Sequence, residues 1–163
     1  MNKIVFLDRD GVINRDPGDY TCSLEEFEIL PDVIPALMQL HSMGFLLMIV
    51  TNQGGVAKGL YTLAEVERIH HSFALTCLNQ GVLISEFWIS PHHESKGKSL
   101  SRKPGSLLLE RGLSKYKADP KLCFMIGDKG RDVQAAKSAG VEGIQIPVNG
   151  SLLEAVKIIR AKS

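Results

Sequence analysis

The stretch IVFLDRDG at residues 4–11 determines how the rest of the chain is interpreted. Its four consecutive apolar residues, followed by polar ones, indicate a short strand buried on both faces, as in a parallel sheet. Two carboxylates, Asp8 and Asp10, stand directly after this strand. An isolated Asp-x-Asp-Gly sequence is also typical of a solvated turn. In open α/β sheets, however, ligands bind beyond the carboxyl ends of the strands, so the residues that follow the other strands become informative.

Outward from this stretch, short apolar runs alternate with segments of helical periodicity. The runs end in polar or glycine-rich residues and lie at Phe45–Val50, Phe87–Ile89, Leu122–Ile126 and Gly143–Ile146. The helical segments lie at Val33–Met43, Leu63–Gln80, Ser106–Lys115, Asp132–Ala139 and Leu152–Ala161. This alternation predicts an α/β fold, a doubly wound, Rossmann-type, parallel five-stranded sheet with helices on both faces.

Capping residues support the predicted helix boundaries. Side chains that can cap a helix N-terminus precede three of the helices, at Asp32, Thr62 and Ser151. Glu65 stands three residues after Thr62, which is the spacing of a capping box. Glycines that can end a helix in a left-handed conformation follow three of them, at Gly44, Gly81 and Gly140.

Composition and charge restrict the class of protein. The length of 163 residues suits one domain, residues 1–163, and 44% apolar and 23% charged residues are typical of globular proteins. No segment outside the expected elements is long enough for a separate cap domain. Nineteen basic and eighteen acidic residues give a net charge of +1, which favours neither a nucleic-acid nor a membrane partner and leaves the oligomeric state open.

The cysteines and the N-terminal segment bear on the compartment. Cys22, Cys77 and Cys123 form no CxxC pair, so neither a disulfide framework nor a cysteine zinc site is indicated. The apolar run near Met1 is too short for a signal peptide or a membrane span. We therefore expect a cytoplasmic protein with reduced thiols.

Polar residues follow the other predicted strands as well. TNQGG (51–55) follows the second strand, GDK (127–129) follows the fourth, and RKPG (102–105) precedes the helix after the third. In this order, DRDGVIN, TNQGG, RKPG and MIGDKGRDVQAA resemble the four motifs of haloacid dehalogenase (HAD) phosphatases. The most similar branch holds D-glycero-D-manno-heptose-1,7-bisphosphate and histidinol-phosphate phosphatases. The resemblance covers residues 4–140, and four ordered motifs are far more specific than any one of them.

The resemblance implies a Mg²⁺-dependent reaction that proceeds through an aspartyl-phosphate. Asp8 would attack phosphorus, which divides one difficult step into two easier ones. Asp10 would protonate the leaving oxygen and then deprotonate the hydrolytic water. Mg²⁺ prefers hard oxygen ligands, which Asp8, Asp128 and the backbone carbonyl of Asp10 would supply. The expected substrate is a small phosphorylated metabolite, first of all the heptose bisphosphate.

Other residues of these motifs would bind the phosphoryl group. Lys103 is expected to act as a point charge on the phosphoryl oxygens, and Thr51 with the backbone amide of Asn52 to complete an oxyanion cradle. Taken singly, Thr51 is also an ordinary strand-ending hydroxyl and Lys103 an ordinary loop cation. Asp132 is expected either to orient Lys129 or Lys103 or to complement the dipole of its helix.

The loop before RKPG departs from the resemblance. Relatives commonly hold a structural zinc there with three cysteines and a histidine, whereas serines stand at the aligned positions Ser90, Ser99 and Ser101. Hydroxyls do not replace thiolates, and His92 with His93 does not complete a tetrahedral site, so no zinc is expected. The two histidines are either plain loop residues or substrate contacts.

Arg102 is the stronger candidate for substrate recognition. It adjoins Lys103, and its planar guanidinium suits a second phosphate or a vicinal diol. The alternative is that Arg102 only buttresses the loop that would otherwise be held by zinc.

Other functions remain to be weighed against the heptose bisphosphate. Histidinol phosphate is the second candidate substrate, and a nucleic-acid 3′-phosphatase is disfavoured by the neutral charge and few aromatic residues. A non-enzymatic phospho-receiver domain needs an aspartate at the end of the third strand, where Ser90 stands. A merely phosphate-binding homologue would not need the full set of Asp8, Asp10, Lys103 and Asp128.

Overall fold

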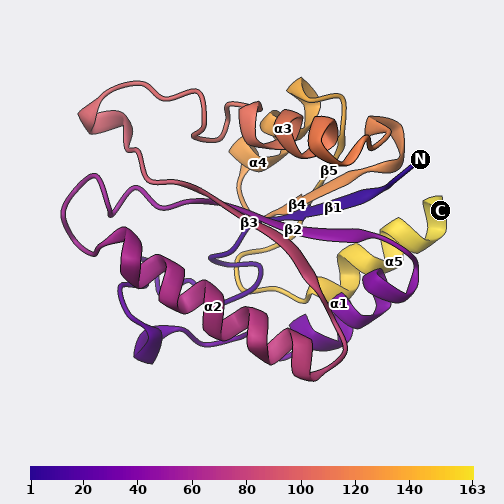
Figure 1. Ribbon diagram of the computed structural model, residues 1–163, viewed down its shortest axis with the longest axis horizontal. Coiled ribbons are helices and arrows are strands. Elements are labelled where there is room, and N and C mark those ends of the chain that lie inside the picture. Colours follow the sequence, from indigo (N-terminus) through magenta and orange to yellow (C-terminus); the bar gives the residue numbers. More distant parts are fainter.

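The structure is a computed structural model that describes residues 1–163, and its five strands form one parallel sheet (Figure 1). The strands are β1 (Ile4–Leu7), β2 (Leu46–Asn52), β3 (Ile84–Ser90), β4 (Phe124–Gly127) and β5 (Glu142–Gln145). Their order across the sheet is β3-β2-β1-β4-β5, so β1 is central and the direction of winding reverses beside it. The predicted α/β class and the five-stranded parallel sheet are confirmed.

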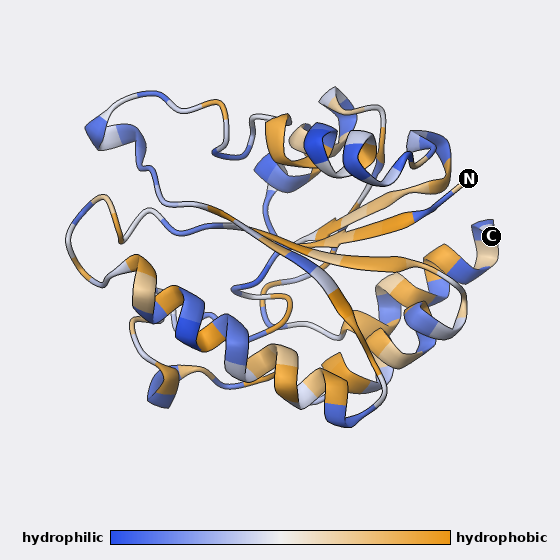
Figure 2. Cartoon of the chain, in the orientation of Figure 1, coloured by the Kyte–Doolittle hydropathy of each residue, from blue (hydrophilic) through white to orange (hydrophobic).

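Helices cover both faces of this sheet, as expected. One face carries α1 (Val33–Ser42), α2 (Leu63–Asn79) and α5 (Leu152–Lys162), and the other carries α3 (Leu107–Tyr116) and α4 (Gly130–Ser138) (Figure 1). Alternate residues of β1 serve the two sides, because Val5 and Leu7 pack toward α1 and α5 while Ile4 and Phe6 pack toward α3. Figure 2 shows apolar residues concentrated along the strands and on the inner sides of the helices.

Only β1 has its predicted bounds, and the other four strands begin or end one to three residues away from the prediction, including the starts of β3 and β4. β3 begins at Ile84, three residues earlier than predicted, because Glu86 accepts hydrogen bonds from Lys115 and Tyr116 and so tolerates a half-buried position. β4 begins two residues later than predicted, because Pro120–Leu122 form a 3₁₀ turn instead. Two further 3₁₀ turns occupy 24–26 and 94–96 in the long loops.

The predicted caps were right at one helix and wrong at two. The Thr62 hydroxyl accepts a hydrogen bond from the Glu65 amide at 3.2 Å, as the sequence predicted. Neither Asp32 nor Ser151 caps its own helix, because the Ser151 hydroxyl donates to the Asp32 carboxylate and joins the starts of α1 and α5. The three predicted C-terminal glycines all have positive φ angles, as a left-handed helix end requires: Gly44, Gly81 and Gly140. No helix here has the length and apolar character needed to cross a membrane.

Candidate active site

The sequence motifs meet at the carboxyl edge of the sheet. Asp8 follows β1, Thr51 and Asn52 end β2, and Asp128 follows β4. Because β2, β1 and β4 are neighbours, these strand ends lie side by side. Lys103 comes from the segment between β3 and α3, and its ammonium reaches Asp8. The residues predicted from four separate motifs therefore surround one position.

Lys103 is the centre of a buried ion-pair network. Its side chain is 1% exposed, and its Nζ lies 2.9 Å from Asp8 Oδ1 and 2.7 Å from Asp132 Oδ1. The same ammonium donates to the Val50 carbonyl at 2.8 Å. Burial alone would lower the pKa of Lys103, but the carboxylates of Asp8 and Asp132 outweigh it and raise the pKa. Lys103 is therefore a fixed positive charge at every physiological pH.

Asp132 has two partners, one on each carboxylate oxygen. Oδ1 faces Lys103, and Oδ2 accepts a hydrogen bond from the Lys129 backbone amide at 3.1 Å. The residue also lies in the first turn of α4, so it both contacts Lys103 and complements the helix dipole. Gly127 makes room for it, since an added Cβ would lie 2.2 Å from the Asp132 Cβ. The Lys129 side chain turns instead to Asp128, with Nζ 3.1 Å from Oδ2.

The two carboxylate oxygens of Asp8 have different surroundings. Oδ1 accepts hydrogen bonds from Lys103 Nζ and from the Arg9 backbone amide, both at 2.9 Å. No protein group donates to Oδ2, so this oxygen is available to a ligand. Burial raises the pKa of Asp8 to about 7, although Lys103 counteracts the effect. Lys103 therefore does not fully compensate the negative charge of the Asp8 carboxylate, and a second cation beside it would stabilise the ionised form.

Carboxylate oxygens gather beside Asp8. Asp8, Asp128 and Asp132 each offer an oxygen, and these oxygens lie within 4.8 Å of one another. Both oxygens of Asp128 are buried, and neither accepts a well-oriented hydrogen bond, although Lys129 is within ion-pair distance. A buried carboxylate without donors is costly unless a cation or water satisfies it. The donor set of hard oxygens fits Mg²⁺, and Asp132, which is already paired with Lys103, is the least available of the three.

Asp10 is not part of this oxygen cluster, and three donors hold its carboxylate. Its Oδ1 accepts from Arg9 Nη2 at 2.9 Å and from Asn14 Nδ2 at 3.0 Å, and its Oδ2 accepts from Gln53 Nε2 at 2.9 Å. Burial would raise the pKa of Asp10, but the charge of Arg9 and these hydrogen bonds lower it overall. Asp10 is therefore ionised, and its carboxylate is fixed in orientation. Its side chain is 29% exposed.

The end of β2, where the phosphate cradle was predicted, is hydrogen-bonded to the segment that carries Lys103. The Asn52 side chain binds the main chain of Lys103 in both directions, donating to its carbonyl and accepting from its amide, each at 3.0 Å. Thr51 is buried, and its hydroxyl accepts from Gln53 Nε2 at 2.8 Å. Asn52 thus fixes the segment that carries Lys103, a role that the sequence did not suggest.

A chain of serine hydroxyls holds the loop in which relatives would place zinc. Ser101 Oγ lies 2.9 Å from Ser90 Oγ and 2.9 Å from Ser99 Oγ, and the Ser101 amide also donates to Ser99. The Arg102 guanidinium adds a hydrogen bond to the His92 carbonyl at 3.0 Å. Hydrogen bonds therefore cross-link loop residues 90–102, and most of them involve the serines that stand at the positions of the cysteines described for relatives.

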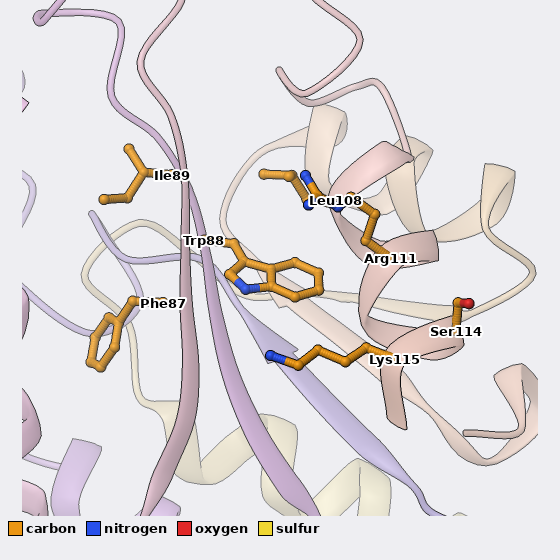
Figure 3. A pocket seen from close by; sticks show the side chains of 7 residues that line it. All are labelled: Phe87, Trp88, Ile89, Leu108, Arg111, Ser114 and Lys115. Carbon is orange, nitrogen blue, oxygen red and sulfur yellow. The ribbon is translucent and has the colours of Figure 1, made fainter. Parts of the chain in front are cut away.

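A large cavity lies outside this site. It measures about 520 Å³ and lies along β3, at the edge of the sheet, between that strand and α3 (Figure 3). Trp88 faces Arg111 across it, and Lys115 reaches toward the same space (Figure 3). Its lining includes no carboxylate, histidine or cysteine and no residue of the four motifs, so it is not the candidate active site.

Comparisons with known proteins agree with the site. The family model described as HAD-hydrolase-like matches residues 100–151. The D-glycero-beta-D-manno-heptose-1,7-bisphosphate 7-phosphatase of Pasteurella multocida is 34% identical over 155 residues, which cover 92% of this chain and 84% of the relative. The enzyme of the same name from Haemophilus influenzae is 36% identical over 147 residues, covering 87% of this chain and 79% of the relative. The chain belongs to the HAD superfamily of phosphatases.

The fold of this HAD phosphatase is similar to those of solved phosphatase structures. The D,D-heptose 1,7-bisphosphate phosphatase of B. bronchiseptica, complexed with magnesium and phosphate, matches with a TM-score of 0.88 and 25% identity, and the match covers 100% of both chains. A HAD-like phosphatase of Mesorhizobium loti matches with a TM-score of 0.83 and 26% identity, over 97% of this chain and 87% of the other.

Sequence reasoning missed the buried groups behind Asp10 in this HAD phosphatase. Arg9 is 2% exposed, and its Nη1 lies 3.4 Å from His70 Nε2 on α2. His70 in turn stacks on Phe87 with ring centroids 4.7 Å apart. The position of Arg9 between the two aspartates of the DRD motif was the available signal, but a charged residue there does not by itself indicate burial. Burial and, to a smaller extent, the charge of Arg9 lower the pKa of His70 to about 3.

The neutral His70 should make the folded HAD phosphatase sensitive to mild acid. Between about pH 6.5 and pH 3, the unfolded chain binds a proton that the folded protein excludes, so stability is complete above this range and falls as the pH is lowered. One such group costs about 1.4 kcal/mol per pH unit. The raised pKa of Asp8 acts in the opposite direction over this range, so the effect of His70 is measured by comparison. Between pH 7.0 and 5.5, urea unfolding should show a less favourable change in stability in the wild type than in His70→Phe. His71→Phe, at an exposed neighbouring position, should keep the wild-type slope, and equal slopes in all three proteins would contradict the assignment.

Proposed function

We propose that this HAD phosphatase hydrolyses a phosphomonoester of a small sugar metabolite in a Mg²⁺-dependent reaction through an aspartyl-phosphate, with D-glycero-D-manno-heptose 1,7-bisphosphate as the first candidate. The observation that carries the proposal is the buried Lys103 paired with Asp8, beside a buried Asp128 carboxylate that accepts no well-oriented hydrogen bond and has only an ion-pair contact with Lys129. A phosphate dianion repels anionic nucleophiles, and fixed positive charge is what allows a carboxylate to approach it.

Asp8 is the proposed nucleophile, through the oxygen that has no donor. Lys103 and the Arg9 amide hold Oδ1, which leaves Oδ2 to form the bond to phosphorus. The bond between phosphorus and the leaving oxygen breaks, and that oxygen takes a proton from Asp10. The Lys103 ammonium neutralises part of the charge on the phosphoryl oxygens, and Thr51 with the Asn52 amide would complete the cradle.

Asp10 would exchange roles between the two halves of the reaction. Its pKa is lowered in the free site, so it begins as a carboxylate and needs a proton before it can act as an acid. The arrival of a phosphate dianion favours the protonated form, because a like charge nearby raises the pKa of a carboxylate. After the leaving group departs, Asp10 is again a base, and it would deprotonate the water that attacks the aspartyl-phosphate and releases inorganic phosphate.

Asp8 and Asp128 would hold Mg²⁺, and the backbone carbonyl of Asp10 remains a predicted third ligand. When bound, the cation supplies Lewis-acid stabilisation of the phosphoryl charge. Exhaustive dialysis against EDTA should therefore abolish turnover of p-nitrophenyl phosphate, and added Mg²⁺ should restore it. Elemental analysis should find no stoichiometric zinc, because the 90–102 loop offers hydroxyls instead of thiolates. Full turnover after chelation would remove the metal from the mechanism, and one zinc per chain would refute the interpretation of the loop.

The positive charges of Arg102, Arg131 and Lys58, which lie near one another at the mouth of the site, favour a second phosphate on the substrate. Arg102 and His93 both pack against Gly54, where an added Cβ would lie 3.1 Å from Arg102 Nη1 and 2.7 Å from His93 Cδ2. Burial and the nearby charge of Arg131 lower the pKa of Arg102, while burial, Lys58 and Arg102 lower that of His93. Like charges held together are relieved by an anionic ligand, whereas histidinol phosphate would bring a cationic amine to them. The bisphosphate is therefore favoured over the monophosphate.

Arg102→Ala should separate these substrates. The loss of a charge-assisted hydrogen bond should lower kcat/KM for the sugar bisphosphate by about 1.5–3 kcal/mol, which is about tenfold or more, and affect p-nitrophenyl phosphate far less. Kinetics on both, on histidinol phosphate and on a 3′-phosphorylated oligonucleotide test the proposal. Arg160→Ala on α5, where the guanidinium contacts Gln39, is the control. Parallel losses on all substrates would leave Arg102 as a brace of the loop through its bond to the His92 carbonyl.

A further inference from the structure

Tyr61 returns to the site at the end of the loop that connects β2 to α2. Its side chain is buried, with the residue 6% exposed, and its hydroxyl donates to Gln53 Oε1 at 2.6 Å. Gln53 is itself only 2% exposed. Gly55 makes this approach possible, because a Cβ there would lie 2.2 Å from the Tyr61 ring. The tyrosine therefore packs on the loop backbone with its hydroxyl aimed inward.

The hydroxyl fixes which way the Gln53 amide faces. Since Oε1 accepts the tyrosine proton, the two protons of Nε2 point to the opposite side, where they reach Asp10 Oδ2 at 2.9 Å and Thr51 Oγ1 at 2.8 Å. Burial raises the pKa of Tyr61 to about 12, so its hydroxyl remains a donor at physiological pH. A half-turn of the amide would instead bring Oε1 against the Asp10 carboxylate, and two acceptors repel each other.

We infer that Tyr61 is a positioning residue that acts through Gln53 on the proton-transferring carboxylate of Asp10. The inference rests on the role proposed above for Asp10. Arg9 and Asn14 hold only Oδ1, so Gln53 is the one protein donor that fixes the rotation of the carboxylate through Oδ2. The same amide ties Asp10 to Thr51, which links the proton-transferring group to the phosphate cradle. An unlocked amide would leave Asp10 in place but poorly oriented toward the leaving oxygen.

Tyr61→Phe tests this inference, because it removes the hydroxyl and keeps the ring on Gly55. The first half-reaction is reported by kcat/KM, measured with an alkyl phosphate such as a sugar phosphate and with p-nitrophenyl phosphate, whose leaving group needs no proton. We expect kcat/KM for the alkyl substrate to fall on the order of tenfold, a part of what a general acid contributes, and that for the aryl substrate to remain near the wild-type value. Tyr116→Phe, which removes a hydroxyl bound to Glu86 on β3, should change neither.

Asp10→Asn, measured in parallel, separates a failure of the inference from a failure of the proposed function. If Asp10→Asn discriminates between the two leaving groups but Tyr61→Phe does not, Tyr61 only packs the loop and the inference is overturned. If Asp10→Asn shows no discrimination, Asp10 is not the acid, and the inference falls with the proposed mechanism. Equal losses on both substrates in Tyr61→Phe, or no loss on either, would also overturn it.

Discussion

Asp8→Asn should lower turnover of every phosphomonoester by roughly 10⁴-fold or more while the protein stays folded, a loss on the scale seen when a covalent nucleophile is removed. The amide has nearly the same shape as the carboxylate and keeps an oxygen for Lys103 and the Arg9 amide. It is, however, a poor nucleophile and a weaker ligand for a cation. Steady-state kinetics on p-nitrophenyl phosphate and on the sugar bisphosphate would measure the loss, with circular dichroism to check the fold.

A second readout makes this test specific to the covalent intermediate. Rapid quenching of the wild-type reaction should trap phosphate on the protein at Asp8, whereas Asp8→Asn should trap none. Asp19→Asn, an exposed aspartate in the loop after β1, is the matched control and should behave like the wild type. Turnover within tenfold of the wild type in Asp8→Asn would remove Asp8 from the mechanism.

Lys103→Ala should have a large effect on both activity and stability. The change leaves the buried Asp8 and Asp132 carboxylates facing each other without the ammonium that lies within 3 Å of both. Removing one partner from a buried ion pair costs about 3–5 kcal/mol, because a buried charge is left uncompensated. Turnover should fall on every substrate alike, since Lys103 is proposed to contact the phosphoryl group common to them all.

Urea unfolding at neutral pH measures the stability component. Lys157→Ala on α5, where the lysine is 71% exposed and pairs with Glu154, should change the free energy of unfolding by less than about 0.5 kcal/mol. If Lys103→Ala were no less stable than Lys157→Ala, the network would contribute nothing to folding. Retained activity in Lys103→Ala would rule out its role on the phosphoryl group.

The sequence was most informative where local pattern and topology point the same way. β1 was predicted with its observed bounds, because four apolar residues in a row fit a strand covered on both faces. Asp8, Thr51 and Asp128 could be expected together because parallel strands end at one edge of a sheet. β3 was predicted too short because Glu86 interrupts its apolar pattern, and the α3 residues that accommodate Glu86 are distant in sequence.

Side-chain partners across loops were beyond the sequence for a related reason. Nothing local distinguishes an Arg9 that folds back onto Asp10 from one that reaches solvent, and burial against α2 decides it. Asp132 could have faced either Lys103 or Lys129, and the close approach that Gly127 permits selects Lys103. The cap predicted at Ser151 was wrong because a tertiary partner, Asp32, competes for the same hydroxyl.

The serine cross-links in the 90–102 loop also determine what this part of the molecule is sensitive to. Thiolates oxidise to disulfides and sulfenic acids, and they bind metal only when deprotonated. Hydroxyls do neither, so the contacts among Ser90, Ser99 and Ser101 do not depend on the redox state of the surroundings. The segment leading into Lys103 can therefore keep its shape during peroxide stress or zinc starvation, conditions under which a thiolate-bound loop would lose its anchor.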